Sequence, residues 1–131
     1  MRFADVFNKK FCNMWKNILL VGLGGGAGSI LRYLVTLAGQ LLHWTSWTAT
    51  LSVNAMGSFL IGIFLSACRS SDWKLLLVVG LCGGFTTYST FSAQSLDLLR
   101  SGNFFGGSAY ILGMLLLCLL CVWAGSSLCS Q

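Results

Sequence analysis

Four long apolar runs, separated by short polar stretches, dominate the sequence. They cover residues 18–40, 47–68, 75–96 and 104–129, and only the first contains a charge, Arg32. Each run is close to or above the ~20 apolar residues that a helix needs to cross the hydrocarbon core of a bilayer. The pattern predicts an all-α integral membrane protein with four transmembrane helices. Because the connections are short, consecutive helices are expected to be antiparallel.

The middle of the third run is unusually polar for a membrane span. Gly83 and Gly84 are followed by a hydroxyl-rich stretch from Thr86 to Ser92. Polar groups at that depth are costly unless they face protein or a water-filled path. Paired glycines weaken a helix and let its carbonyls leave the hydrogen-bond ladder. We therefore expect the third helix to be broken at mid-membrane. Transporters and channels place ions at broken membrane helices of this kind.

Small residues recur four apart in the first run, Gly22 with Gly26 and Gly24 with Gly28. This spacing is typical of a face on which another membrane helix packs closely. Arg32 follows one turn later, and a lone arginine within a span is expected to face carbonyls or a watery vestibule.

Asn54 is the strongest polar residue of the second run. Its amide suits a hydrogen bond that joins two helices of the bundle. It equally suits a donor that lines a path for an anion. The spacing alone leaves both interpretations open.

Composition and charge agree with a single membrane domain covering residues 1–131, since 56% of the residues are hydrophobic and 8% are charged. Basic and aromatic residues alternate over positions 1–16, which predicts a short amphipathic helix at the membrane surface. The Lys and Arg residues outside the spans are six on the N-terminal side and one on the other. They are Arg2, Lys9, Lys10, Lys16, Arg69 and Lys74 against Arg100. This bias predicts that both termini are cytoplasmic. The positive charge is thus explained by membrane topology and by contact with the lipid surface, and it does not indicate a nucleic-acid partner.

Residues for enzymatic chemistry are sparse. The acidic residues are Asp5, Asp72 and Asp97, and none is placed to pair with another for acid/base work. No set of His, Cys, Asp or Glu has the spacing of a metal or acid/base site. Cys118 and Cys121 form a C-x-x-C inside a span, where we interpret them as packing residues. We expect the chain not to be an enzyme.

Three motifs resemble the signatures of the CrcB/Fluc fluoride channels. They are G-G-A-G-S-I-L-R-Y at 25–33, V-N-A-M-G-S-F-L-I-G at 53–62 and G-x-x-G-G-F-T-T-Y-S-T-F-S at 80–92. The resemblance implies a fluoride-selective passive channel that exports cytoplasmic fluoride across a bacterial inner membrane and relieves its toxicity. It also implies a homodimer of two subunits inserted with opposite orientations, with two fluoride pathways along the subunit interface.

The resemblance further assigns roles to residues. The carbonyls of Gly83 and Thr86 would hold a structural Na⁺ on the two-fold axis. The rings of Tyr88 and Phe91 would line the fluoride pathway as an aromatic box. The amide of Asn54 and the hydroxyls of Thr87, Ser89 and Thr90 would supply polar contacts along it. Arg32 would lie near a vestibule that attracts anions, and Tyr110 would be a further vestibule or structural polar residue.

The sequence departs from the family pattern at several positions. Tyr88 stands where phenylalanine is usual, and Gln94 stands where glutamate is common. Met114 and Cys118 occupy places where serines often occur in the fourth span, so one row of hydroxyl groups along the pathway would be missing. These departures leave conduction and selectivity open.

Three alternatives remain beside the homodimeric channel. A small multidrug-type exporter is disfavoured because it needs a membrane-embedded carboxylate, which no span has at mid-depth. A structural subunit without transport is disfavoured because it would avoid the cost of the hydroxyl cluster. The charge bias leaves open a heterodimer, in which this chain needs a non-identical, opposite-facing partner.

Overall fold

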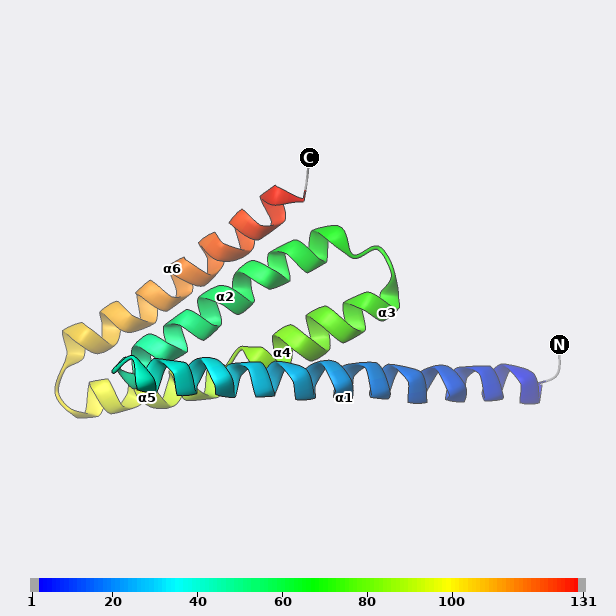
Figure 1. Ribbon diagram of the computed structural model, residues 1–131, viewed down its shortest axis with the longest axis horizontal. Helices are drawn as coiled ribbons and strands as arrows, with labels where there is room; N and C mark the ends of the chain where they lie inside the picture. The colour runs from blue at the N-terminus through cyan, green and yellow to red at the C-terminus, as the bar shows by residue number, and fades with distance from the viewer. Residues whose placement is uncertain (1–2, 130–131) are drawn as a thin grey trace.

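Four long helical arms form the molecule, and the chain runs through them in sequence order (Figure 1). The computed structural model describes the backbone of residues 3–129 and the side chains of residues 13–129. The first, second and fourth arms are single helices, α1 (Phe3–Leu41), α2 (Ser46–Ala67) and α6 (Phe104–Leu128). All four arms are long and apolar enough to cross a membrane, and the described residues contain no strand. The expected all-α fold with four transmembrane helices is confirmed.

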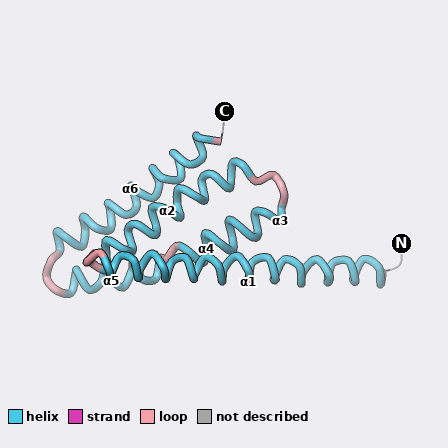
Figure 2. Tube along the Cα trace, viewed as in Figure 1, coloured by secondary structure: helices cyan, strands magenta, loops and turns pink. Residues whose placement is uncertain are grey.

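The third arm is built from four helical pieces. They are α3 (Ser71–Trp73), the π-helix η1 (Lys74–Cys82), α4 (Gly83–Phe85) and α5 (Tyr88–Arg100). Between α4 and α5 the backbone is extended, with ψ of 156° at Thr86 and 106° at Thr87. Figure 2 shows this gap as a short loop inside an otherwise helical arm. The break predicted for the third span is confirmed and lies at Thr86 and Thr87.

Glycines bring α1 into close contact with the third arm. A Cβ added at Gly24 would overlap the carbonyl oxygen of Leu76, and one at Gly28 would overlap that of Leu81. The predicted packing face is therefore confirmed for this pair. A Cβ at Gly22 or Gly26 would meet nothing within 4 Å, so the other pair faces away from the subunit.

The first helix is longer than one span. The basic N-terminal segment and the first apolar run form one uninterrupted helix, so the separate short helix expected over residues 1–16 is not seen from Phe3 onward. At 1.5 Å per residue, α1 is about 58 Å long, roughly twice the hydrocarbon thickness of a bilayer. Figure 1 shows its N-terminal part extending past the rest of the bundle.

One ion pair ties this extension to the bundle. Lys16 Nζ lies 2.9 Å from a carboxylate oxygen of Asp72 in α3, and both side chains are about half exposed. The start of α1, the connection between α2 and α3, and the end of α6 consequently lie at one end of the bundle (Figure 1). Both termini of a four-span chain therefore share one side of the membrane.

Candidate functional site

Asn54 bonds directly to the break in the third arm. Its Oδ1 accepts a hydrogen bond from the backbone N–H of Thr87 at 2.8 Å, and its Nδ2 donates to the Thr87 carbonyl at 3.1 Å. Asn54 is 8% exposed and Thr87 is 7% exposed, so the two hydrogen bonds satisfy backbone groups at a buried position. Nδ2 also contacts Met114 Sδ at 3.8 Å. Of the two interpretations of Asn54, the interhelical hydrogen bond is present, and its partner is backbone.

Hydroxyl groups cap the helix that begins after the break. Thr87 Oγ1 accepts from the Thr90 N–H at 3.3 Å and donates to Thr90 Oγ1 at 2.9 Å. Ser89 Oγ lies 3.4 Å from Thr87 Oγ1. Thr87 is therefore the N-cap of α5, a position that threonine favours because its oxygen satisfies a free N–H.

The same bonds release two carbonyls from the helical ladder. In an unbroken α-helix, the carbonyls of Gly83 and Thr86 would accept from the N–H groups of Thr87 and Thr90. Those N–H groups donate instead to Asn54 Oδ1 and to Thr87 Oγ1. The two carbonyls expected to hold a cation are thus the ones whose helical donors are engaged elsewhere.

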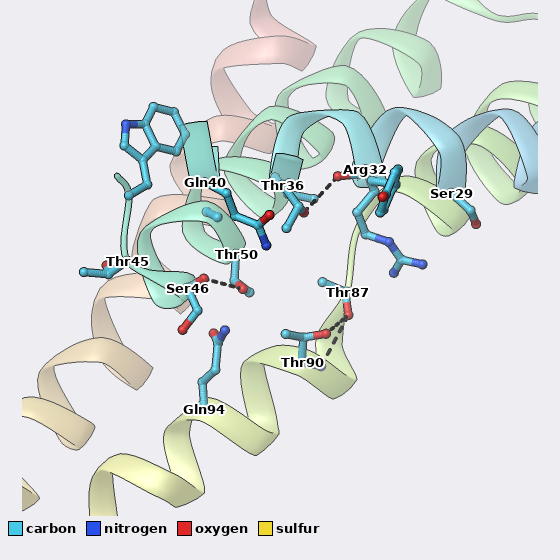
Figure 3. Close-up of a pocket in the computed structure, with 14 residues that line it drawn as sticks. Ser29, Arg32, Thr36, Gln40, Thr45, Ser46, Thr50, Thr87, Thr90 and Gln94 are labelled. Carbon is cyan, nitrogen blue, oxygen red and sulfur yellow. Dashed lines mark hydrogen bonds between the residues drawn. The ribbon is translucent and has the colours of Figure 1, made fainter. Parts of the chain in front are cut away.

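A polar hollow of about 490 Å³, here called the vestibule, opens on one side of the break (Figure 3). Its polar lining comes from one face of α1, the start of α2 and the start of α5. These residues are Ser29, Arg32, Tyr33, Thr36 and Gln40, then Thr45, Ser46 and Thr50, and then Thr87, Thr90 and Gln94. The break is therefore reachable from a polar space that begins near the connection between α1 and α2.

Arg32 carries the only charge among the described residues that line the vestibule. Figure 3 shows its guanidinium extending from α1 toward the side of the hollow that Thr87 forms. The one ion pair found among the described side chains joins Lys16 to Asp72, so Arg32 has no carboxylate partner there. An unpaired, half-buried guanidinium gives the vestibule a positive potential.

A second hollow of about 370 Å³, here called the aromatic groove, borders the other side of the break. Asn54, Thr86, Tyr88, Phe91 and Met114 are among the residues that line it. The ring centroids of Tyr88 and Phe91 are 5.7 Å apart. Phe91 is 6% exposed, whereas Tyr88 is 77% exposed and faces away from the subunit.

Tyr110 lies in the interior rather than beside Arg32. Its ring centroid is 5.4 Å from that of Phe91, and its hydroxyl donates to Gln94 Oε1 at 2.8 Å. Gln94 lines the vestibule, so this hydrogen bond connects Tyr110 to that hollow. Its hydrogen bond to Gln94 and its ring contact with Phe91 are the contacts that a structural polar residue would make.

The structure thus groups the expected pore residues in two sets. Thr87 and Thr90 share the vestibule with Arg32, while Asn54, Tyr88 and Phe91 line the aromatic groove. Ser89 lines neither hollow and is exposed.

Sequence reasoning missed several vestibule residues. On α1 these are Ser29, Thr36 and Gln40, whose spacing of three or four from Arg32 or from one another marks one helix face. That spacing was the available signal. Thr50 and Gln94 belong to other arms, and nothing in their local sequence indicates that they meet this face.

The chain is similar in sequence to proteins of a known family. A model of the protein family described as "CrcB-like protein, Camphor Resistance (CrcB)" matches residues 19–126. A relative named "Fluoride-specific ion channel FluC" from Phocaeicola vulgatus is 44% identical over 115 residues, which are 84% of this chain and 95% of the relative. A relative of the same name from Elusimicrobium minutum is 46% identical over 114 residues, which are 84% of this chain and 90% of the relative. Another, from Chlorobaculum tepidum, is 43% identical over 118 residues, which are 86% of this chain and 94% of the relative. The chain therefore belongs to the CrcB family.

Proposed function

We propose that this chain is a subunit of a fluoride-selective passive channel that releases cytoplasmic fluoride across a bacterial inner membrane and so relieves fluoride toxicity. The observation that carries the proposal is the break at Thr87, bonded by Asn54 and bordered on one side by a positively charged vestibule and on the other by the aromatic groove. The names of the relatives support fluoride as the ion.

The chemistry of the two hollows suits a small, strongly hydrated anion. Fluoride accepts hydrogen bonds strongly, so a path for it must offer donors at close spacing to replace water. The vestibule offers the Arg32 guanidinium, hydroxyls and amides. Aromatic ring edges carry a positive partial charge, so the edges of Tyr88 and Phe91 suit an anion that has left those donors.

The proposed transport is passive. Within the described part of the spans, no carboxylate lies at mid-depth that could couple fluoride movement to protons, since Asp72 and Asp97 lie toward the ends of the third arm. Fluoride that is trapped inside a cell would leave through such a path down its own gradient.

We further propose that two subunits pair in antiparallel orientation across the face that carries Tyr88 and Gly83. Both residues are exposed in the single subunit. The released carbonyls of Gly83 and Thr86 fit a structural Na⁺, because a hard cation prefers neutral oxygen ligands. Two carbonyls from each subunit would surround the ion. When bound, Na⁺ supplies positive charge that offsets nearby anions.

Ion efflux from liposomes tests the proposed function. Detergent-purified chain, reconstituted into vesicles loaded with fluoride or with chloride, is expected to release fluoride rapidly and little chloride. Solubilised subunits can pair in either relative orientation, so the assay needs no second protein. Equal release of both ions would contradict selectivity, and release no faster than from protein-free vesicles would contradict the channel.

Replacing Arg32 is expected to reduce fluoride flux in a salt-dependent way. Arg32→Gln removes the vestibule's charge, so flux should fall about threefold to tenfold at ~0.01 M ionic strength and by less at ~0.15 M, where the Debye length shortens to about 8 Å. Initial efflux rates at the two ionic strengths measure this. Arg100→Gln, at the end of α5 and outside the vestibule, is the matched control. An equal loss at both ionic strengths would show that Arg32 acts through the fold instead.

Replacing Phe91 is expected to lower flux while the subunit stays folded. Phe91→Ile keeps an apolar side chain but removes a ring that contacts Tyr88 and Tyr110, so flux should fall by about tenfold, on the order of two ring contacts worth roughly 0.5–1.5 kcal/mol each. The control is Phe105→Ile, because Phe105 is 88% exposed and borders neither hollow. Unchanged flux in Phe91→Ile would remove this ring from the pathway.

A further inference from the structure

Two sulfur atoms lie side by side in the wall of the aromatic groove. Met114 and Cys118 are one turn apart on α6, and both border this hollow. The Cys118 thiol donates to Met114 Sδ, and the two sulfurs are 3.9 Å apart. Thiolate and thioether groups select soft metal ions such as Cu⁺, whereas oxygen ligands suit hard ones such as Mg²⁺. This part of the wall therefore has the ligand chemistry of a soft-metal site.

The separation of the two sulfurs fits one metal ion bound by both. A metal–thiolate bond is about 2.3 Å long. An ion bonded to both sulfurs at their separation of 3.9 Å would then make a sulfur–metal–sulfur angle of about 116°, which is close to trigonal. The pair thus supplies two ligands of a three-coordinate site and leaves one position for water or another small ligand.

The thiol proton lies where such an ion would bind. It points from Cys118 toward Met114 Sδ, which is only a weak acceptor, so little is lost when this hydrogen bond is given up. A soft cation would take its place: the S–H bond breaks, the proton leaves to water, and the ion bonds to the thiolate and the thioether. With a monovalent ion the site stays neutral, whereas a divalent ion would leave a net charge, which is costly inside a membrane.

The surroundings disfavour hard cations. Among the described residues that line the aromatic groove, there is no carboxylate and no histidine. Met114 is 4% exposed, and Cys118 is half-buried against the cluster that contains Met114, Phe91 and Tyr110. A divalent oxygen-seeking ion would find no charged oxygen ligand there, so the groove favours a soft monovalent ion over a hard divalent one.

A bound ion would lie close to the break in the third arm. Asn54 Nδ2 is 3.8 Å from Met114 Sδ, so an ion about 2.3 Å from that sulfur lies at most about 6 Å from Nδ2. The same Nδ2 donates to the Thr87 carbonyl. The ion and its third ligand would occupy the part of the groove that lies between α6 and the break, and would obstruct it.

We propose that Met114 and Cys118 form a binding site for a soft monovalent cation, of the class of Cu⁺ and Ag⁺, and that the bound ion blocks the aromatic groove. The binding does not depend on the proposed function, whereas the block of fluoride flow rests on it.

Equilibrium dialysis of the detergent-purified chain against buffered free Ag⁺ tests the binding. Ag⁺ is the probe because it is soft, monovalent and stable in air, and nitrate replaces chloride, which would precipitate it. Met114→Leu keeps every thiol and nearly the same side-chain volume. The free Ag⁺ that half-fills the tightest site should rise at least about tenfold in this variant, because one of two ligands is lost. Equal retention by the native chain and by Met114→Leu would overturn the two-sulfur site.

Three further variants separate the pair from ordinary sulfur groups. Met56→Leu is the control for Met114→Leu, because Met56 is 49% exposed on α2 and borders neither hollow. Cys121→Ser is the control for Cys118→Ser, because Cys121 lies on α6 but does not border the groove. Cys118→Ser should lose the tightest-bound Ag⁺, and both controls should keep it. Loss of that ion in Cys121→Ser but not in Cys118→Ser would overturn the proposal.

Fluoride efflux in the presence of Ag⁺ tests the block. With silver nitrate on both sides of the vesicle membrane at about 100 times the half-filling concentration, the site is almost fully occupied, and release should fall below about a tenth of the silver-free rate. Each variant is compared with its own silver-free rate, and Met114→Leu and Cys118→Ser should need at least about tenfold more Ag⁺ for half-block. Undiminished efflux from native chain that binds Ag⁺ would overturn the block. Native chain that releases no fluoride even without Ag⁺ would contradict the proposed function instead, and the dialysis would still decide the site.

Discussion

Asn54→Ala is expected to remove at least about nine-tenths of the fluoride flux in reconstituted vesicles. The substitution leaves the N–H and the carbonyl of Thr87 without their side-chain partner in a site that is shielded from water. Each unsatisfied backbone group costs about 1–3 kcal/mol, and 1.36 kcal/mol corresponds to a tenfold change in rate. The break should close toward a continuous helix, which would return the Gly83 carbonyl to the ladder and narrow the opening between the vestibule and the aromatic groove.

Ser52→Ala is the matched control for Asn54→Ala. Ser52 lies on the same helix, but its hydroxyl donates only to the Thr48 carbonyl one turn earlier, at 3.0 Å. Its flux should stay within a factor of about two of native. Size-exclusion chromatography in detergent checks that both variants remain assembled. Native flux in Asn54→Ala would show that the break persists without its bond to α2.

Gly28→Ala is expected to destabilise the whole subunit. A single methyl group there would overlap the carbonyl oxygen of Leu81 and lie 2.8 Å from the Phe85 N atom. Both are backbone atoms of the third arm, so the clash is relieved only if α1 and the third arm move apart. Overpacking of this kind costs about 1–3 kcal/mol. We expect a lower thermal unfolding midpoint in detergent and a lower yield of folded protein.

Gly113→Ala separates this clash from the general effect of replacing glycine in a helix. A Cβ at Gly113 meets nothing within 4 Å. Because alanine favours a helix by about 1 kcal/mol over glycine, this variant should be as stable as native or more so. Equal midpoints for Gly28→Ala and Gly113→Ala would show that the close approach of α1 to the third arm is not required.

Much of the fold follows from local sequence. Apolar runs of membrane length predict the four arms, and the glycine pair beside a hydroxyl cluster predicts that the third arm is broken. The glycines themselves are helical in α4, and the break follows them at Thr86 and Thr87. The lengths of the runs are set by the bilayer, and a polar, glycine-containing stretch within one of them is enough to indicate a break, although not the residue at which it occurs.

The bonding of the site is less predictable because it depends on distant residues. Asn54 is 33 positions from Thr87, and its amide could have paired with any neighbouring helix. Spacing likewise does not tell which glycine pair of α1 meets the third arm, since Gly22 and Gly26 have the same interval as Gly24 and Gly28. A basic amphipathic pattern also does not distinguish a helix that lies on a membrane from the start of a longer one, so the pattern alone predicts a separate helix where the structure has the beginning of α1.

The π-helix ahead of the break makes the third arm sensitive to length as well as to composition. The nine residues of η1 are wound more loosely than an α-helix, whose residues each advance by about 100°. Inserting or deleting one residue in η1, with its winding unchanged, would rotate α4 and the break by slightly less than that angle relative to α1. Over evolution, this segment should therefore accept exchanges among apolar side chains but reject insertions and deletions, whereas the connections between arms are free to vary in both.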